Sequence, residues 1–206
     1  MPKYVKPLVF LLCLIPLFSL CWNAFQGDLG ANPIEKVTHI TGEWALRFLL
    51  LTLAVTPVRR LMRWSFLLRL RRMLGLYTFF YAGLHFLTYL VLDQFFDFAA
   101  IGKDILKRPY ITVGFAAFVL LIPLAATSTN NMMRRLGRHW KSLHQTIYVI
   151  SVLAILHYLW LVKADHLQPL VYAFMLLVLF MVRVWYQRRP RSTPNLTEKN
   201  AVESSR

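Results

Sequence analysis

Six long apolar runs separated by short polar connections constrain this chain more than any other feature of its sequence. They cover residues 7–25, 42–58, 74–92, 110–127, 145–162 and 168–187. Each run is close to the ~20 residues that an α-helix needs to cross a bilayer. With 57% hydrophobic and 16% charged residues, the chain is more apolar than a soluble core requires. The sequence predicts an all-α integral membrane protein, a bundle of six transmembrane helices.

The basic residues indicate how this bundle is oriented. The chain has 24 Lys and Arg against 9 Asp and Glu, and most basic residues lie in the N-terminus, residues 59–72, residues 134–141 and the segment from Arg183 onward. These are alternate connections, and cytoplasmic loops carry the excess of positive charge. Both termini are therefore predicted to be cytoplasmic in a multi-pass protein of the bacterial inner membrane. Such a charge excess needs no nucleic-acid partner to explain it.

Residues 1–187 are predicted to form one transmembrane domain, and residues 188–206, rich in polar residues and Pro, a disordered cytoplasmic tail. The first run follows Lys3 and Lys6 like a signal peptide, but no A-x-A-like cleavage site follows it, so we expect a retained helix. The connections leave no room for an extramembrane catalytic domain. No Gly-rich dinucleotide fingerprint and no internal repeat is evident.

Two histidines within the apolar runs carry the predicted chemistry. His85 lies in the third run and His157 in the fifth, each 13 residues beyond a polar boundary marked by Arg72 and His144. At the rise of an α-helix, both lie roughly 20 Å above that boundary. Two imidazoles at one level can be the axial ligands of a six-coordinate haem. Gly83 and Ala154 are predicted to leave space for the macrocycle. Thr88, Tyr89 and Tyr158 could orient the ring nitrogens or meet the haem propionates.

Other interpretations of these histidines remain open. Each ring could instead hydrogen-bond a neighbouring helix, or titrate in a transporter or proton relay. A metal site with three histidines is disfavoured because His144 lies too far along the helix from His157. No C-x-x-C-H motif is present, so any haem is bound noncovalently.

A basic group is predicted at the inner boundary. His144 could ligate a second haem only if its helix bends, because 13 residues leave it roughly 140° from His157 on an ideal helix. Alternatively, Arg71 and Arg72 with His144 could bind an anionic group such as a flavin phosphate or a propionate. The two arginines could instead serve only as positive-inside residues that orient the chain in the membrane. His39 is expected to be an interfacial cap, with a quinone or docking site as the alternative.

The chain resembles the ferric-reductase-like transmembrane family over nearly all of residues 25–187. Within it, the chain is similar to the haem-binding membrane subunits of bacterial periplasmic protein-methionine-sulfoxide reductase systems. The resemblance is carried by LGANP at 29–33, HITG at 39–42, Thr56-Pro57, RRMLGL at 71–76, Leu84-His85, RPY at 108–110, TST at 127–129, Trp140 through His144, and HYLW at 157–160.

This resemblance implies haem b held by His85 and His157, with His144 as a further ligand candidate, for one or two haems, and FMN as a further cofactor. It implies a non-catalytic electron-transfer subunit of an oxidoreductase complex. Electrons would pass from the quinol pool or a cytoplasmic flavin reductase to a periplasmic molybdopterin subunit that reduces methionine sulfoxide in oxidised proteins. Larger family members carry four haem histidines and a fused flavin domain, whereas this chain has three such histidines.

Overall fold

The computed structural model describes residues 4–64, 66–163 and 166–188. Within these ranges the regular structure is helical, without strands, which confirms the all-α prediction. The elements are α1 (Val5–Phe25), α2 (Pro33–Met62), α3 (Leu67–Thr88), the π-helical turn η1 (Tyr89–Asp93), α4 (Phe98–Lys107), α5 (Pro109–Ala126), α6 (Asn130–Leu136), α7 (Arg138–Gln145), α8 (Ile147–Leu161) and α9 (Leu167–Arg188).

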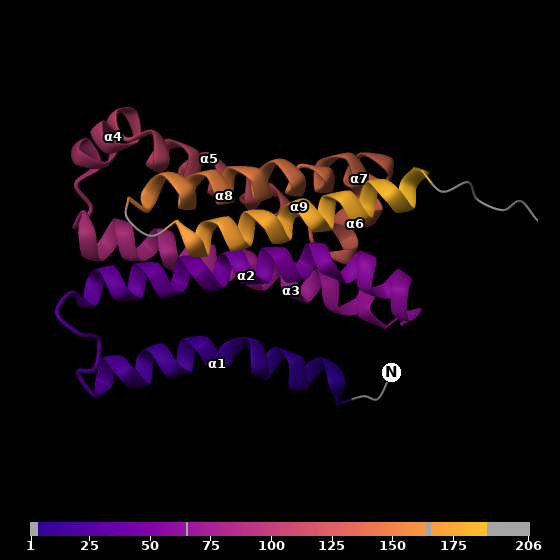
Figure 1. Ribbon diagram of the computed structural model, residues 1–206, viewed down its shortest axis with the longest axis horizontal. Helices are drawn as coiled ribbons and strands as arrows, with labels where there is room; N and C mark the ends of the chain where they lie inside the picture. Colours follow the sequence, from indigo (N-terminus) through magenta and orange to yellow (C-terminus); the bar gives the residue numbers. More distant parts are fainter. Residues whose placement is uncertain (1–3, 65, 164–165, 189–206) are drawn as a thin grey trace, which may run out of the picture.

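The long helices α1, α2, α3, α5, α8 and α9 run along the same axis of the molecule (Figure 1). The start of α1 and the end of α9 lie at one end, and α4 lies at the other. α2 packs most closely on α3, and α5 packs most closely on α8. The bundle therefore contains two tight helix pairs, and each pair contributes one of the two intramembrane histidines.

Five segments of the described chain are long and apolar enough to cross a membrane: α1, α3 with η1, α5, α7 with α8, and α9. α2 is longer than any of these helices but includes Glu43 and Arg47. Arg47 donates to the Glu43 carboxylate at 2.5 Å and to the Tyr172 hydroxyl at 2.9 Å, so its charge has partners within the bundle. α2 as a sixth span and the cytoplasmic side of both termini stay predictions.

The helices differ from the apolar runs mainly where polar residues continue a helix. α2 begins at Pro33, well before residue 42, because the Asn32 side chain accepts the backbone N–H of Glu35 and Pro33 suits the first helical turn. The short helices α4 and α6 lie in the connections, and α7 precedes the predicted run at 145–162; hydropathy does not reveal where these helices begin. Of the predicted tail, Arg188 ends α9, and residues 189–206 lie outside the described residues.

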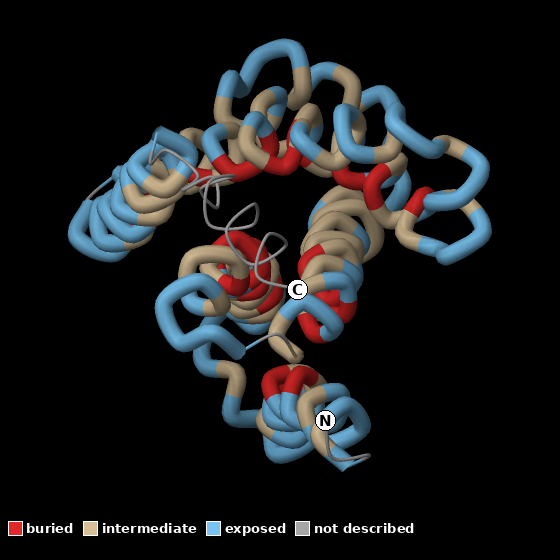
Figure 2. Tube along the Cα trace, turned by 90° about the vertical axis from the view of Figure 1, so that its right-hand side faces the viewer, coloured by how far each residue is buried: buried red, intermediate tan, exposed pale blue. Residues whose placement is uncertain are grey.

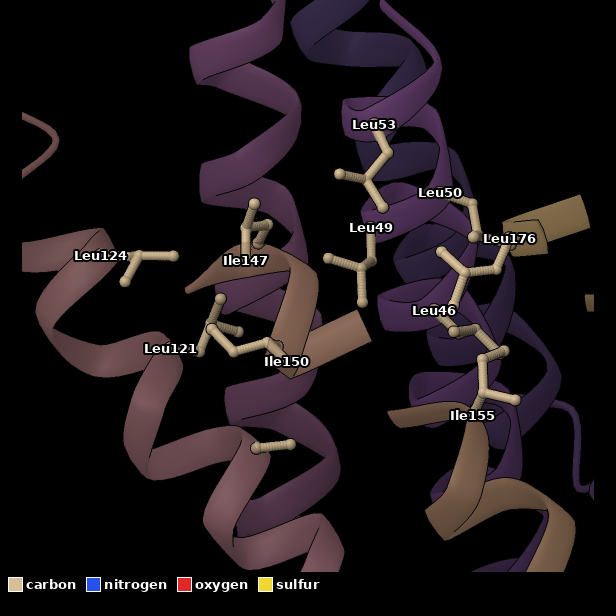
Figure 3. Packing of buried hydrophobic residues seen from close by; sticks show 11 residues of the cluster. Leu46, Leu49, Leu50, Leu53, Leu121, Leu124, Ile147, Ile150, Ile155 and Leu176 are labelled. Carbon is tan, nitrogen blue, oxygen red and sulfur yellow. The ribbon is translucent and has the colours of Figure 1, made fainter. Parts of the chain in front are cut away.

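The core joins the two helix pairs. Leucines of α2 meet Leu121 and Leu124 of α5, Ile147 and Ile150 of α8, and Leu176 of α9 (Figure 3). Viewed along the bundle, the buried positions face inward and the outer surfaces are exposed (Figure 2). On the spans these exposed positions are largely apolar, such as Phe174 and Val152. This is the pattern of a bundle whose outer surface contacts lipid.

Candidate haem site

His85 and His157 lie side by side between the two helix pairs. His85 belongs to the last turn of α3, and His157 to the second half of α8. Their ring centroids are 6.1 Å apart, with an angle of 75° between the ring planes. The structure thus brings together the two histidines that sequence reasoning paired, although they come from segments far apart in the chain.

Each ring is held by a backbone carbonyl of the partner helix in its pair. Nδ1 of His85 lies 2.8 Å from the carbonyl oxygen of Thr38 in α2, and Nδ1 of His157 lies 2.7 Å from that of Tyr110 in α5. A carbonyl oxygen only accepts hydrogen bonds, so each Nδ1 carries the proton and donates. The lone pair is therefore on Nε2, which is the tautomer that metal-binding histidines adopt.

A glycine makes each of these hydrogen bonds possible. Gly42 and Gly114 lie one helical turn beyond Thr38 and Tyr110, beside the carbonyl that each ring reaches. A Cβ at Gly42 would lie 3.0 Å from Nδ1 of His85, and a Cβ at Gly114 would lie 2.6 Å from Nδ1 of His157. Any other residue at either position would push the imidazole away from its carbonyl partner.

The two half-sites resemble each other in their spacing and contacts. Each histidine and its carbonyl partner are 47 residues apart, and the glycine follows that partner by the same step in both halves. The segments around the histidines also match, with AGLHFL from Ala82 to Leu87 and AILHYL from Ala154 to Leu159. The two halves of the site therefore share one local arrangement of histidine, carbonyl and glycine.

A cavity of about 540 Å³ surrounds both rings. Its walls are apolar along α2, α3, α5 and α8, and its mouth is polar. Wall residues include Leu46, Leu49, Phe86, Phe118, Leu121 and Ile150; mouth residues include Glu35, His39, Asp93 and Arg108. Hydrogen bonding to the Tyr110 hydroxyl and the nearby Asp104 carboxylate raise the pKa of Arg108. A charged guanidinium thus lies at the mouth.

The residues present fit a haem. Two imidazoles that bind one metal from opposite sides, each through a nitrogen about 2 Å away, have ring centres roughly 6 Å apart. The observed 6.1 Å agrees with that arrangement. The apolar walls suit a porphyrin, and the polar mouth suits its propionates. In the described part of the chain, no group of three or more His, Cys, Asp or Glu could hold a metal ion, so a three-histidine metal site is not formed there.

The predicted inner group lies outside this cavity. Nδ1 of His144 donates to the Trp140 carbonyl at 3.2 Å, and the His144 ring stacks on Trp140 with centroids 4.0 Å apart. Arg72 donates to the Asn130 side chain, and Arg71 is half-buried. None of His144, Arg71 and Arg72 lines the cavity. Nε2 of His144 is buried without a hydrogen-bond partner in the described structure.

The predicted supporting residues make hydrogen bonds outside the two histidine rings, although Tyr89 and Tyr158 line the cavity. The Thr88 hydroxyl bonds carbonyls of its own helix, Tyr89 donates to Asp104, and Tyr158 donates to Gln168. None of these hydrogen bonds reaches a histidine ring; Nδ1 of each ring bonds a backbone carbonyl instead. Gly83 faces open space, whereas Ala154 lines the cavity. His39 lies at the mouth, with Nε2 3.9 Å from the Glu35 carboxylate.

Sequence reasoning missed Gly42 and Gly114 as site residues. Gly42 was visible only as part of the HITG stretch, and Gly114 as an isolated glycine within an apolar run. A glycine inside a helix weakens it relative to alanine, so both positions carried a signal of close approach. The carbonyls of Thr38 and Tyr110 gave no such signal in the sequence, since every residue has a backbone carbonyl.

A sequence model described as the ferric reductase like transmembrane component matches residues 41–155, more than half of the chain. The match includes His85 and ends just before His157. With the helical bundle and its apolar outer surface, this defines the class: a ferric-reductase-like, multi-pass bacterial membrane protein.

Curated relatives narrow this class further. Three proteins named "Protein-methionine-sulfoxide reductase heme-binding subunit MsrQ" are similar over most of the chain. The one from Herminiimonas arsenicoxydans is 52% identical over 93% of this chain and 89% of its own length. Those from Rhodospirillum rubrum and Caulobacter vibrioides are 55% and 49% identical, covering 85% and 91% of this chain and 85% and 90% of their own lengths. The chain therefore belongs to the MsrQ family. No solved structure matches it.

Proposed function

We propose that this chain is the haem b-binding electron-transfer subunit of a protein-methionine-sulfoxide reductase, with His85 and His157 as the residues that would hold the haem. The observation that carries the proposal is the pair of adjacent imidazoles, with ring centroids 6.1 Å apart in an apolar cavity, whose Nδ1 atoms both donate to backbone carbonyls. The relatives named as heme-binding subunits support the same assignment.

Residues of the protein fix the tautomer and the orientation of the His85 and His157 rings. The Thr38 and Tyr110 carbonyls hold each ring in one tautomer and one orientation, which also raises the basicity of the ligating nitrogen. Bound haem iron supplies a centre that takes up and releases single electrons. The apolar walls exclude water from this centre, and burial of this kind tunes its reduction potential.

The direction of electron flow follows from the predicted orientation. The cavity mouth is at the α4 end of the bundle, opposite the start of α1 and the end of α9. With both termini in the cytoplasm, the mouth faces the periplasm. We therefore place the acceptor, a periplasmic molybdopterin subunit that forms a heterodimer with this chain, on that side. The donor would be the quinol pool or a cytoplasmic flavin reductase, and this chain would catalyse no reaction alone.

The inner basic group is a second candidate ligand site. The buried Nε2 of His144 without a partner favours a group that supplies one. We assign to His144, Arg71 and Arg72 either the flavin phosphate of FMN or a second haem. The break between α7 and α8 at Thr146 supplies the helix distortion that a second haem would need. A proton relay is less well supported, because both intramembrane rings have Nδ1 committed to carbonyls.

Spectroscopy of the purified protein tests the main site. We expect a Soret band and about one haem per chain by pyridine haemochrome from this cavity. His85→Ala and His157→Ala should each abolish that haem, and added imidazole should restore part of the absorption. His139→Ala and His166→Ala, at exposed positions outside both candidate sites, are matched controls and should keep it. Unchanged absorption in both single variants, or wild-type protein without haem, would refute the proposal.

A further inference from the structure

Four large apolar side chains at the α4 end of the bundle are exposed. Phe95 and Phe96 lie in the turn after η1, Phe98 starts α4, and Leu106 is near its end. Their exposed fractions are 76%, 52%, 72% and 87%. Such a group is larger than the scattered apolar residues of an ordinary surface, so something must cover it.

α4 has three distinct strips along its length. Ile101 is buried, and Ile105 lines the cavity beside it, so one strip faces the protein. Successive residues are about 100° apart on a helix. On this spacing Phe98 lies beside Ile105 and Leu106 lies about 80° further round, so both adjoin the protein-facing strip on the same side, and both are exposed. Lys103 and Lys107, one turn apart, form the next strip beyond Leu106.

The structure holds this surface in a defined orientation. Phe95 and Phe96 have φ angles of 46° and 61°, a left-handed turn that is rare for bulky residues. The Asp97 carboxylate caps α4 by accepting the backbone N–H groups of Ala99 and Ala100. At the other end, Arg108 pairs with Asp104 at 3.3 Å. The exposed side chains of Phe98 and Leu106 therefore belong to a helix that is capped at its start and joined to an ion pair at its end.

We propose that the strip formed by Phe98 and Leu106 lies at the membrane surface. Its two side chains would contact phospholipids of the adjacent leaflet. α4 is joined directly to two membrane spans, since η1 ends at Asp93 and α5 begins at Pro109. Its exposed side chains adjoin spans whose own apolar residues are also exposed, such as Leu92 in η1 and Val119 in α5. Apolar residues beside a strip of lysines are the arrangement of a helix lying at a bilayer interface.

This placement has a consequence for the cavity. Ile105 and Arg108 line the cavity mouth, on and directly after α4. A helix seated in the interface by Phe98 and Leu106 holds these two side chains at a fixed height against the mouth. α4 is then a lipid-anchored wall of the cavity, and its position responds to the membrane as well as to the protein.

Spin-label accessibility tests the proposal in the full-length protein. Single cysteines replace Phe98, Leu106, Lys103 or Lys107 in a Cys13→Ser, Cys21→Ser background, in nanodiscs of phosphatidylethanolamine and phosphatidylglycerol. We expect labels at 98 and 106 to collide several-fold more with oxygen relative to a water-soluble nickel chelate than labels at 103 and 107. Phe174→Cys, on the outer surface of α9, provides the lipid-exposed reference.

Two outcomes would overturn the proposal. Labels at 98 and 106 that are as open to the nickel chelate as those at 103 and 107 would place the strip in water. Labels that become protected only when the periplasmic reductase subunit is added would make the strip a protein-docking surface.

Discussion

At the scale of single residues, the site depends on two glycines as well as on two histidines, because a side chain at either glycine would crowd a histidine ring. The His157 ring reaches the Tyr110 carbonyl at 2.7 Å only because Gly114 has no side chain beside it. The Gly42 contact with His85 is slightly looser. The two halves should therefore differ in how much crowding they tolerate.

Gly114→Ala should displace the His157 ring, since the added Cβ would lie 2.6 Å from Nδ1. We expect most of the bound haem to be lost, and a smaller loss for Gly42→Ala, where the distance is 3.0 Å. Haem content per chain and the Soret band measure both effects. Gly83→Ala is the matched control, because nothing lies within 4 Å of its Cβ position. Equal haem loss in all three variants would contradict this explanation.

At the scale of elements, α1 is attached differently from the other long helices. It lies at the edge of the bundle (Figure 2). It contributes no residue to the cavity wall. Two tyrosines of α3 hold it: the Tyr77 hydroxyl donates to the Phe10 carbonyl and the Tyr81 hydroxyl to the Cys13 carbonyl, both at 2.8 Å. Stability of the α1 contact and haem binding should therefore be separable.

Tyr81→Phe should destabilise the protein by about 1 kcal/mol, because it leaves the buried Cys13 carbonyl without this donor. Thermal unfolding in detergent, followed by far-UV circular dichroism, measures the change. Haem content should stay at the wild-type level, since α1 does not line the cavity. Tyr4→Phe, at an exposed position, is the control. Loss of haem in Tyr81→Phe at low temperature would show that α1 supports the site after all.

At the scale of the whole molecule, the bundle has two chemically different ends. The end with the start of α1 and the end of α9 carries most of the basic residues of the described chain, including Arg59 and Arg60 in the last turn of α2 and Arg188 in the last turn of α9. The other end carries the cavity mouth with its acidic side chains Glu35 and Asp93. The positive-inside rule then predicts which end faces the cytoplasm.

Cysteine labelling in intact cells tests this orientation. In a Cys13→Ser, Cys21→Ser background, Lys103→Cys should react with a membrane-impermeant maleimide added outside, because α4 lies at the predicted periplasmic end. Arg138→Cys, at the start of α7, should react only after permeabilisation. The reverse pattern would move the cavity mouth to the cytoplasm and exclude a periplasmic acceptor docked at it.

The sequence by itself determined the helical class. Backbone in lipid is satisfied only in helices or closed barrels, and runs of about 20 apolar residues have the length of a membrane-spanning helix, whereas a barrel strand needs only about 10 residues. It also singled out His85 and His157, since polar side chains within such runs are rare enough to stand out. It did not reveal where the short, partly polar helices α4, α6 and α7 begin.

Only the tertiary structure decided how the histidines are used. Residues that are distant in sequence supply the Thr38 and Tyr110 carbonyls and the space at Gly42 and Gly114. It also separated His144 and the adjacent arginines from the main cavity. The physical reason is that hydrogen bonds to backbone carbonyls and the absence of a Cβ depend on which helices pack together, and residue identities along one helix do not encode that packing.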